Sequence, residues 1–335
     1  MFFAIKPTIQ PVHCLLHTAD CRLFGKIGFA EAPVRAFLLF LAQKEGFKNF
    51  ALKFKIFRNT AARFVAGETL DDAVRAVRQT NLQNIAATLD LLGEDTRSQE
   101  DAQSACRDII GILDRIRSEN VDCNVSIKLT QLGLGIDAES TYRNLLQIVK
   151  HARDKSNFIR VDMEDSRYTQ RTLDMVTRTH EQFDNVGTVI QSYLYRSRQD
   201  VIELMKRRIR IRLVKGAYLE SENIAFRKKA DADSNFAGLM QMLLAGETYN
   251  AIATHDEAII NATKAFAGSH NISKDHFEFQ MLFGIRRDLQ VRLAQEGFKV
   301  RIYIPYGARW YSYFMRRLAE RPANVLFILR NLFKE

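Results

Sequence analysis

Three short segments of the sequence place polar or charged side chains at every second position of an apolar run. They are residues 125–130 (VSIKLT), 160–164 (RVDME) and 208–215 (RIRIRLVK). Successive side chains of a β-strand point to opposite faces, so Ser126, Lys128 and Thr130 are expected to share one face of their segment. Arginines on a half-buried strand require anionic partners. Asp162 and Glu164 are candidates, and so is a bound anion.

Lys128 is compatible with three kinds of chemistry. It can be a Schiff-base nucleophile, a ligand for an anion or the partner in a buried ion pair. Polar residues inside a barrel often form layers of ion pairs that only stabilise the fold. Each polar residue of these segments can therefore be structural and have no role in chemistry. The spacing does not separate these alternatives.

A second group of charges follows the last apolar run of the chain. Arg316 and Arg317 are adjacent, and Glu320 comes one helical turn after Arg316. On a helix, Arg316 and Glu320 form an i,i+4 pair, worth roughly a few tenths of a kcal/mol at a surface. Two neighbouring arginines can also converge on one carboxylate. Spacing alone favours the surface pair.

Eight short apolar or β-branched runs alternate with segments of helical periodicity. The runs are 85–92, 125–129, 158–163, 188–193, 209–214, 249–254, 277–282 and 300–304, and clear helical periodicity lies at 102–117, 140–152, 169–182 and 198–207. Alternation of this kind predicts right-handed crossovers and a parallel sheet, and eight units predict an α/β fold, a (βα)8 TIM-like barrel. No G-x-G-x-x-G or G-x-x-x-x-G-K motif occurs, which argues against a dinucleotide-binding open sheet.

Composition places the chain among globular proteins and gives it an excess of positive charge. The 335 residues are 47% hydrophobic with a formal net charge of +10. Residues 1–70 hold ten basic and four acidic residues, a net of +6, and we interpret them as an N-terminal helical arm before a barrel at 71–335. The apolar run 36–42 is too short to span a bilayer, and no signal peptide is indicated.

The four cysteines are too few for a disulfide scaffold in a chain of this length. They indicate a reducing, cytoplasmic location. The cluster His13, Cys14, His17 and Cys21 lacks the C-x-x-C pairs of structural zinc sites, so no metal site is predicted. The sequence contains no feature that indicates an oligomeric state.

Read together, the motifs resemble the monofunctional bacterial proline dehydrogenases. They occur in family order from residue 63 to about residue 324: 63–68 (RFVAGE), 127–129 (IKL), 162–164 (DME), 190–193 (IQSY), 212–218 (RLVKGAY), 253–255 (ATH), 277–282 (FEFQML), 301–303 (RIY) and 316–320 (RRLAE). The resemblance implies a flavoenzyme on a (βα)8 barrel. It also implies oxidation of L-proline to 1-pyrroline-5-carboxylate by hydride transfer to FAD, the first step of proline catabolism.

The resemblance also assigns substrate-binding roles. It implies that Arg316 and Arg317 clamp the proline carboxylate, with Lys128 adding positive charge. It implies that Tyr303 packs against the proline ring and excludes larger substrates, and that Glu320 pairs with Lys128 or faces the amine.

Cofactor and catalytic roles follow from the same motifs. The resemblance places Arg212 beside the reacting edge of the flavin, with Asp162 as an acid-base group or as the electrostatic partner of Arg212. Gln191 is expected to hydrogen-bond the isoalloxazine ring. Further cofactor contacts are implied for Met163, Lys215, Gly216, Ala217, Thr254 and His255. Asp256 departs from the family pattern, in which many relatives have Asn.

A quinone is the electron acceptor that the resemblance implies, and this bears on the basic N-terminal arm. Its phenylalanines and lysines are compatible with peripheral contact with the inner face of the cytoplasmic membrane. They are equally compatible with a helical arm packed on the barrel. Two other hypotheses remain at this point. One is a Schiff-base lyase that uses Lys128, and the other is a nucleic-acid binder suggested by net charge alone, which the resemblance disfavours.

Overall fold

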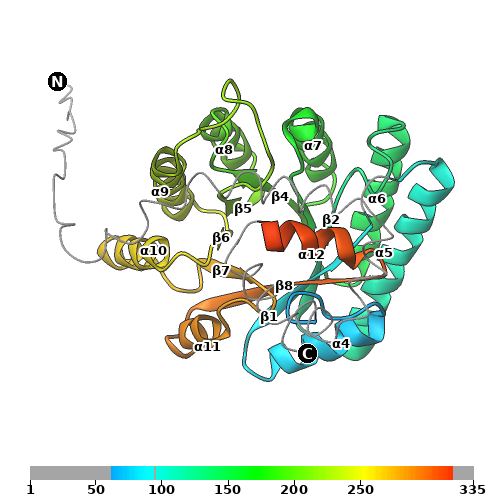
Figure 1. The fold of residues 1–335 in the computed structure, drawn as a ribbon, viewed down its shortest axis with the longest axis horizontal. Helices are drawn as coiled ribbons and strands as arrows, with labels where there is room; N and C mark the ends of the chain where they lie inside the picture. Colours follow the sequence, from blue (N-terminus) through cyan, green and yellow to red (C-terminus); the bar gives the residue numbers. More distant parts are fainter. Residues whose placement is uncertain (1–61, 94–95, 320–335) are drawn as a thin grey trace, which may run out of the picture.

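The computed structural model describes residues 62–93 and 96–319, and these form a closed barrel of eight parallel strands in sequence order (Figure 1). The strands are β1 (Ala86–Leu91), β2 (Cys123–Ile127), β3 (Ile159–Val161), β4 (Val186–Gln191), β5 (Arg210–Val214), β6 (Asn250–Ala253), β7 (Phe277–Leu282) and β8 (Lys299–Tyr306). Each of the eight runs predicted to be a strand is confirmed, with ends shifted by a few residues.

Helices follow the strands, and each predicted helical segment is confirmed. They are α4 (Leu70–Asn81), α5 (Gln99–Glu119), α6 (Ala138–Asp154), α7 (Ser166–His180), α8 (Ser197–Lys206), α9 (Lys229–Ala245), α10 (Glu257–Ser269), α11 (Arg287–Gln295) and α12 (Trp310–Ala319). Several begin at a side-chain cap, as at Ser98 for α5 and Asp137 for α6. These caps satisfy amide groups that the first helical turn leaves without partners.

The barrel strands separate apolar from polar side chains. Val125 and Ile127 of β2, like Val161 of β3, are fully buried in the hydrophobic core that includes the surrounding helices. The intervening residues Ser126 and Arg160 are also buried, but their side chains donate hydrogen bonds to the neighbouring part of the barrel, Ser126 to Asp162 and Arg160 to the Thr188 carbonyl. The interior is therefore polar, and the strand alternation predicted from the sequence determines which side chains it receives.

Two helices depart from a simple alternation. In a regular (βα)8 barrel, the helix after the last strand completes the outer ring. Here α4, which precedes β1, packs against both β8 and β1 and takes that place. Figure 1 shows α12 lying across the centre of the ring of strands. Since α12 follows the carboxyl end of β8, it covers the carboxyl-terminal mouth of the barrel.

No helix within residues 62–93 and 96–319 combines the length and the hydrophobicity needed to cross a bilayer. Most of the predicted N-terminal arm, including residues 1–61 with the His13 and Cys14 cluster, lies outside the described residues. The boundary between an arm and a barrel near residue 70 stays a prediction.

Candidate active site

The mouth of the barrel is framed by α12 and by the segment that leads into α4. The Ala66 amide donates to the Pro305 carbonyl at the end of β8 (3.0 Å), and the Trp310 indole donates to the Glu68 carboxylate (2.8 Å). The ring of Phe64 lies 5.9 Å from that of Phe314. These contacts fix the start of α12 beside the strand ends.

Asp162 is the centre of a buried hydrogen-bond network at this mouth. Its Oδ1 accepts from Arg212 Nη1 (2.8 Å) and from Ser126 Oγ (2.9 Å), and its Oδ2 accepts from the Tyr303 hydroxyl (2.7 Å). Lys128 Nζ lies 3.8 Å from Asp162 Oδ2, the oxygen that also accepts from Tyr303. Residues from β2, β5 and β8 and the segment after β3 therefore meet at one carboxylate. Asp162 forms an ion pair with Arg212, which is one of the two roles that the sequence left open for it.

Lys128 has a second carboxylate partner that sequence reasoning missed. Its Nζ donates to Asp90 Oδ1 at 2.8 Å, and Asp90 is fully buried near the end of β1. Burial raises the pKa of Asp90 and the charge of Asp162 adds to this, while Lys128 opposes it. The signal was present, because Asp90 interrupts an apolar run in the same way as Lys128 and Asp162 do.

Arg212 and Tyr303 complete this network. The guanidinium lies 5.2 Å from the centre of the Tyr303 ring. Burial raises the pKa of Tyr303 well above its usual value, and the charges of Asp162 and Asp90 add to this effect. The hydroxyl therefore keeps its proton and donates a hydrogen bond to Asp162. Nε and Nη2 of Arg212 are buried and have no hydrogen-bond partner among the described residues. These two donors fit an acceptor-bearing ligand at the mouth.

Hydrogen bonds of Gln191 and Glu164 link the carboxyl ends of β2, β3 and β4. Gln191, buried at the end of β4, donates from Nε2 to the Glu164 carbonyl at 3.0 Å. The Glu164 carboxylate accepts from the Thr130 amide at 3.1 Å and from the Thr130 hydroxyl. Of the two candidate carboxylates, Asp162 is the one that forms the described ion pair with Arg212. Thr130 lies past the end of β2, where strand alternation no longer determines direction.

Lys215, directly after β5, was expected to contact a cofactor, and it also holds two carboxylates. Nζ lies 2.7 Å from Asp233 and 2.9 Å from Asp256. Burial by itself lowers the pKa of Lys215, but the hydrogen bonds and charges of Asp233 and Asp256 outweigh it and raise the pKa. Asp256 also caps α10 through the Ala258 amide. The residue that departs from the family pattern thus helps to position Lys215.

Three predicted cofactor residues lie beside Lys215 at the same end of the barrel. Gly216 has a φ of +112°, and a β-carbon there would lie 2.2 Å from the Tyr193 ring, so only glycine fits. Thr254 is buried and its hydroxyl accepts the Asp256 amide (3.1 Å). His255 Nε2 accepts the Leu282 amide (2.9 Å). These contacts fix the backbone at the ends of β5, β6 and β7.

The remaining predicted site residues differ in burial and in whether the structure describes their side chains. Met163 is buried, whereas Ala217 is exposed in the loop after β5. Arg316 and Arg317 belong to α12, but their side chains lie outside the described part of the chain, as does Glu320. Among residues 62–93 and 96–319, no group of three or more His, Cys, Asp or Glu side chains is arranged to hold a metal ion.

The fold and the site define a class of protein. A closed (βα)8 barrel with a buried charged network at the carboxyl ends of its strands is typical of enzymes that bind small molecules at that mouth. Residues 73–330 match the family model described as Proline dehydrogenase, which covers more than three quarters of the chain. The chain belongs to the proline dehydrogenase family.

Individual relatives agree with this assignment. Proline dehydrogenase 2 of Bacillus subtilis is 40% identical over 301 residues, which cover 90% of this chain and 99% of that protein. Proline dehydrogenase of Deinococcus radiodurans is 43% identical over 281 residues, covering 82% and 91% of the two chains.

A solved structure supports the fold. Proline utilization A from Bdellovibrio bacteriovorus, determined after inactivation by N-propargylglycine, superposes with a TM-score of 0.77 at 24% identity. The match covers 85% of this chain but only 36% of that longer one.

Proposed function

We propose that this protein oxidises L-proline to 1-pyrroline-5-carboxylate, with FAD at the barrel mouth as hydride acceptor and a quinone as the final electron acceptor. Family membership supports the reaction. The observation that carries the proposal is the network around Asp162. Lys128, Arg212 and Tyr303 are far apart in the sequence, yet they meet at one buried carboxylate where the resemblance requires an active site.

The residues at the mouth fit a flavin. Nε and Nη2 of Arg212 are buried donors without a described partner, and a flavin ring offers carbonyl and nitrogen acceptors. A positive charge beside that ring stabilises negative charge that develops on it. FAD, when bound, supplies the ring that accepts the hydride. Lys215, Thr254 and His255 lie at adjacent strand ends, where the cofactor contacts are proposed.

The proposed reaction removes two hydrogens from proline. A hydride leaves the ring carbon next to nitrogen, a proton leaves the nitrogen, and a carbon–nitrogen double bond forms. We assign Asp162 to hold the amine side of the substrate, because its carboxylate is buried and fixed by three donors. Tyr303 stays protonated and limits the space beside it.

The substrate carboxylate requires positive charge at the mouth. Arg316 and Arg317 are proposed to bind it, because α12 crosses the mouth. Lys128 is proposed to add positive charge near the substrate carboxylate. Glu320 is proposed to pair with Lys128 or to face the amine. The contact of Lys128 with Asp90 disfavours the Schiff-base alternative, which requires a neutral amine.

Two experiments test this function together. The purified protein should show the visible absorbance of an oxidised flavin, and mass spectrometry of the released cofactor should identify FAD. L-proline with a soluble quinone should yield a product that traps as 1-pyrroline-5-carboxylate. A colourless protein that cannot be reconstituted with FAD, or a flavoprotein that does not turn over L-proline, would contradict the proposal.

Peripheral membrane contact through the arm and a cytoplasmic location remain proposals. The membrane contact depends on residues 1–61, which lie outside the described residues. Flotation of the full chain with anionic liposomes, compared with a chain that begins at residue 61, tests the contact. Equal partitioning of the two forms would remove it.

A further inference from the structure

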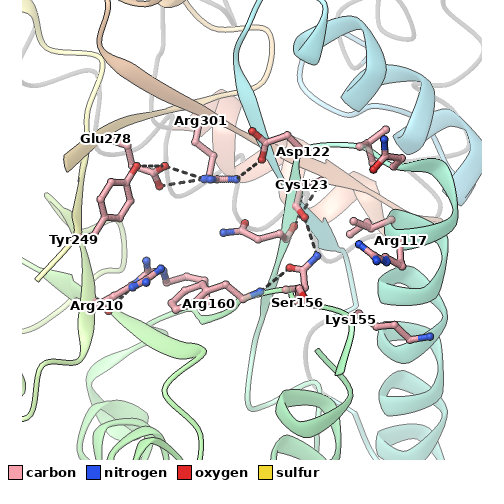
Figure 2. A pocket seen from close by; sticks show the side chains of 16 residues that line it. Arg117, Asp122, Cys123, Lys155, Ser156, Arg160, Arg210, Tyr249, Glu278 and Arg301 are labelled. Carbon is pink, nitrogen blue, oxygen red and sulfur yellow. Dashed lines mark hydrogen bonds and ion pairs between the residues drawn. The ribbon is translucent and has the colours of Figure 1, made fainter. Parts of the chain in front are cut away.

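A polar cavity lies at the opposite end of the barrel from the mouth. Its volume is about 290 Å³, and it is lined at the amino-terminal ends of the strands by Arg160, Arg210, Tyr249, Glu278 and Arg301 (Figure 2). This volume is near the lower limit of ligand-binding pockets and suits a small molecule. The proposed function uses none of these residues.

Part of the positive charge around this cavity is balanced within the protein. Arg301 Nε donates to both carboxylate oxygens of Glu278 (3.0 and 3.1 Å), and Tyr249 donates to the same carboxylate (3.0 Å). Figure 2 shows Arg301 between Glu278 and Asp122. Glu278 is therefore fully engaged by its neighbours, and its pKa is lowered because Arg301 and hydrogen bonds outweigh the effect of burial.

Two other cations at the rim have an ordinary structural explanation. Arg117 lies in the last turn of α5, where a positive charge complements the helix carboxyl end. Lys155 follows α6 and pairs with Asp114 at 2.9 Å. Neither of them requires a ligand.

Arg160 and Arg210 are the charges that remain. Arg160 is 3% exposed, and its Nη1 donates to the carbonyls of Thr188 (2.9 Å) and Arg210 (2.6 Å), while its Nε has no partner among the described residues. Within residues 62–93 and 96–319, no carboxylate forms an ion pair with either arginine. Both guanidinium groups lie against the Phe158 ring, at 4.9 and 5.2 Å from its centre.

This arrangement has a clear electrostatic consequence. The positive charges of Arg160 and Arg210 repel one another. Burial lowers the pKa of Arg160 to about 9. The charges of Arg212 and Arg210 add to this effect, while those of Glu278 and Asp162 partly offset it, so Arg160 is still charged at neutral pH. A counter-ion would remove the repulsion and could accept hydrogen bonds from both groups.

We propose that this cavity binds a compact dianion, either a phosphate group or a small dicarboxylate, between Arg160 and Arg210. Arg160 supplies a fixed, buried donor, and Arg210 supplies an exposed one at the entrance. The cavity lies away from the mouth, because Arg210 is the first residue of β5 and Tyr249 directly precedes β6, while Arg160 reaches the cavity from the middle of β3.

Calorimetric titration of the protein, purified with the cofactor it carries, tests this site. Inorganic phosphate and succinate are titrated separately, at an ionic strength held constant with chloride, and each is repeated with saturating L-proline. We expect saturable binding of at least one dianion that proline does not displace. The dianion that binds more tightly shows whether the site prefers a phosphate group or a dicarboxylate.

A pair of variants on one segment provides the control. Arg210→Gln removes the cavity charge and should weaken binding about tenfold or more while leaving proline oxidation unchanged. Arg208→Gln removes a charge that is exposed and paired with Glu247, and it should bind as the unmodified protein does. Absence of saturable binding, equal weakening in both variants, or displacement by proline would overturn the proposal.

Discussion

Arg212→Lys tests how the site recognises its cofactor. The substitution keeps a positive charge near Asp162 but removes Nε and one terminal nitrogen of the guanidinium. In the structure, Nε and Nη2 are buried without described partners, while Nη1 binds Asp162 and Ser126. Each unsatisfied buried donor costs about 1–3 kcal/mol, and a ligand that accepts hydrogen bonds from both would recover this.

The expected effect follows from these numbers. A loss of about 2 to 2.8 kcal/mol in binding, at the low end of the range for two such donors, corresponds to a roughly 30- to 100-fold larger dissociation constant. We therefore expect Arg212→Lys to weaken FAD binding about 30- to 100-fold, measured by flavin fluorescence on protein stripped of cofactor. Arg210→Lys is the control, because Arg210 lies two residues earlier on the same strand at the opposite end of the barrel. An Arg212→Lys protein that binds FAD within about threefold of the original would refute the role of these donors.

Three further substitutions test the packing of the site. Asp90→Asn removes the carboxylate of a buried pair and should lower the free energy of unfolding by about 3 kcal/mol in urea titrations; a change below about 1 kcal/mol would contradict the pairing. Above about pH 10, the unfolded chain loses the Tyr303 proton while the folded protein keeps it, so stability should fall by about 1.4 kcal/mol per pH unit. Urea unfolding at about pH 9 and about pH 11 should show a shallower fall in Tyr303→Phe, and an identical slope would count against the raised pKa. Gly216→Ala should lower the melting temperature, because its β-carbon meets Tyr193 at a positive φ, whereas Gly238→Ala, which has open space in a helix, should not; equal melting temperatures would argue against the strain.

The barrel itself was predictable because its signals are local. Each strand is a short apolar or β-branched run, and each predicted helix shows three- and four-residue spacing, so the alternation of elements was readable without knowledge of contacts. The polar positions within β2 and β5 also indicated which residues would enter the interior. The Asp162–Arg212 pair was among the alternatives that this pattern left open.

What could not be predicted depends on tertiary arrangement. Periodicity predicts helices between the strands, but it does not reveal that α4 completes the outer ring or that α12 crosses the mouth. Spacing left open whether Asp162 or Glu164 pairs with Arg212, because it does not show that the chain turns after β3 and brings Glu164 to Thr130. Asp90 was missed although its pattern matched, because a lone carboxylate in an apolar strand is informative only when its partner is known.

The roles of Asp162 and of the mouth are tested most directly by anaerobic rapid mixing of the purified protein with L-proline. We expect the absorbance of the oxidised flavin to disappear at a rate that saturates with proline concentration. Asp162→Asn should slow this step by about a hundredfold or more, while Asp174→Asn, on the exposed side of α7, should leave it unchanged. Flavin that stays oxidised in the presence of L-proline, or equal reduction rates in the two variants, would contradict the assignment of the reaction to this end of the barrel.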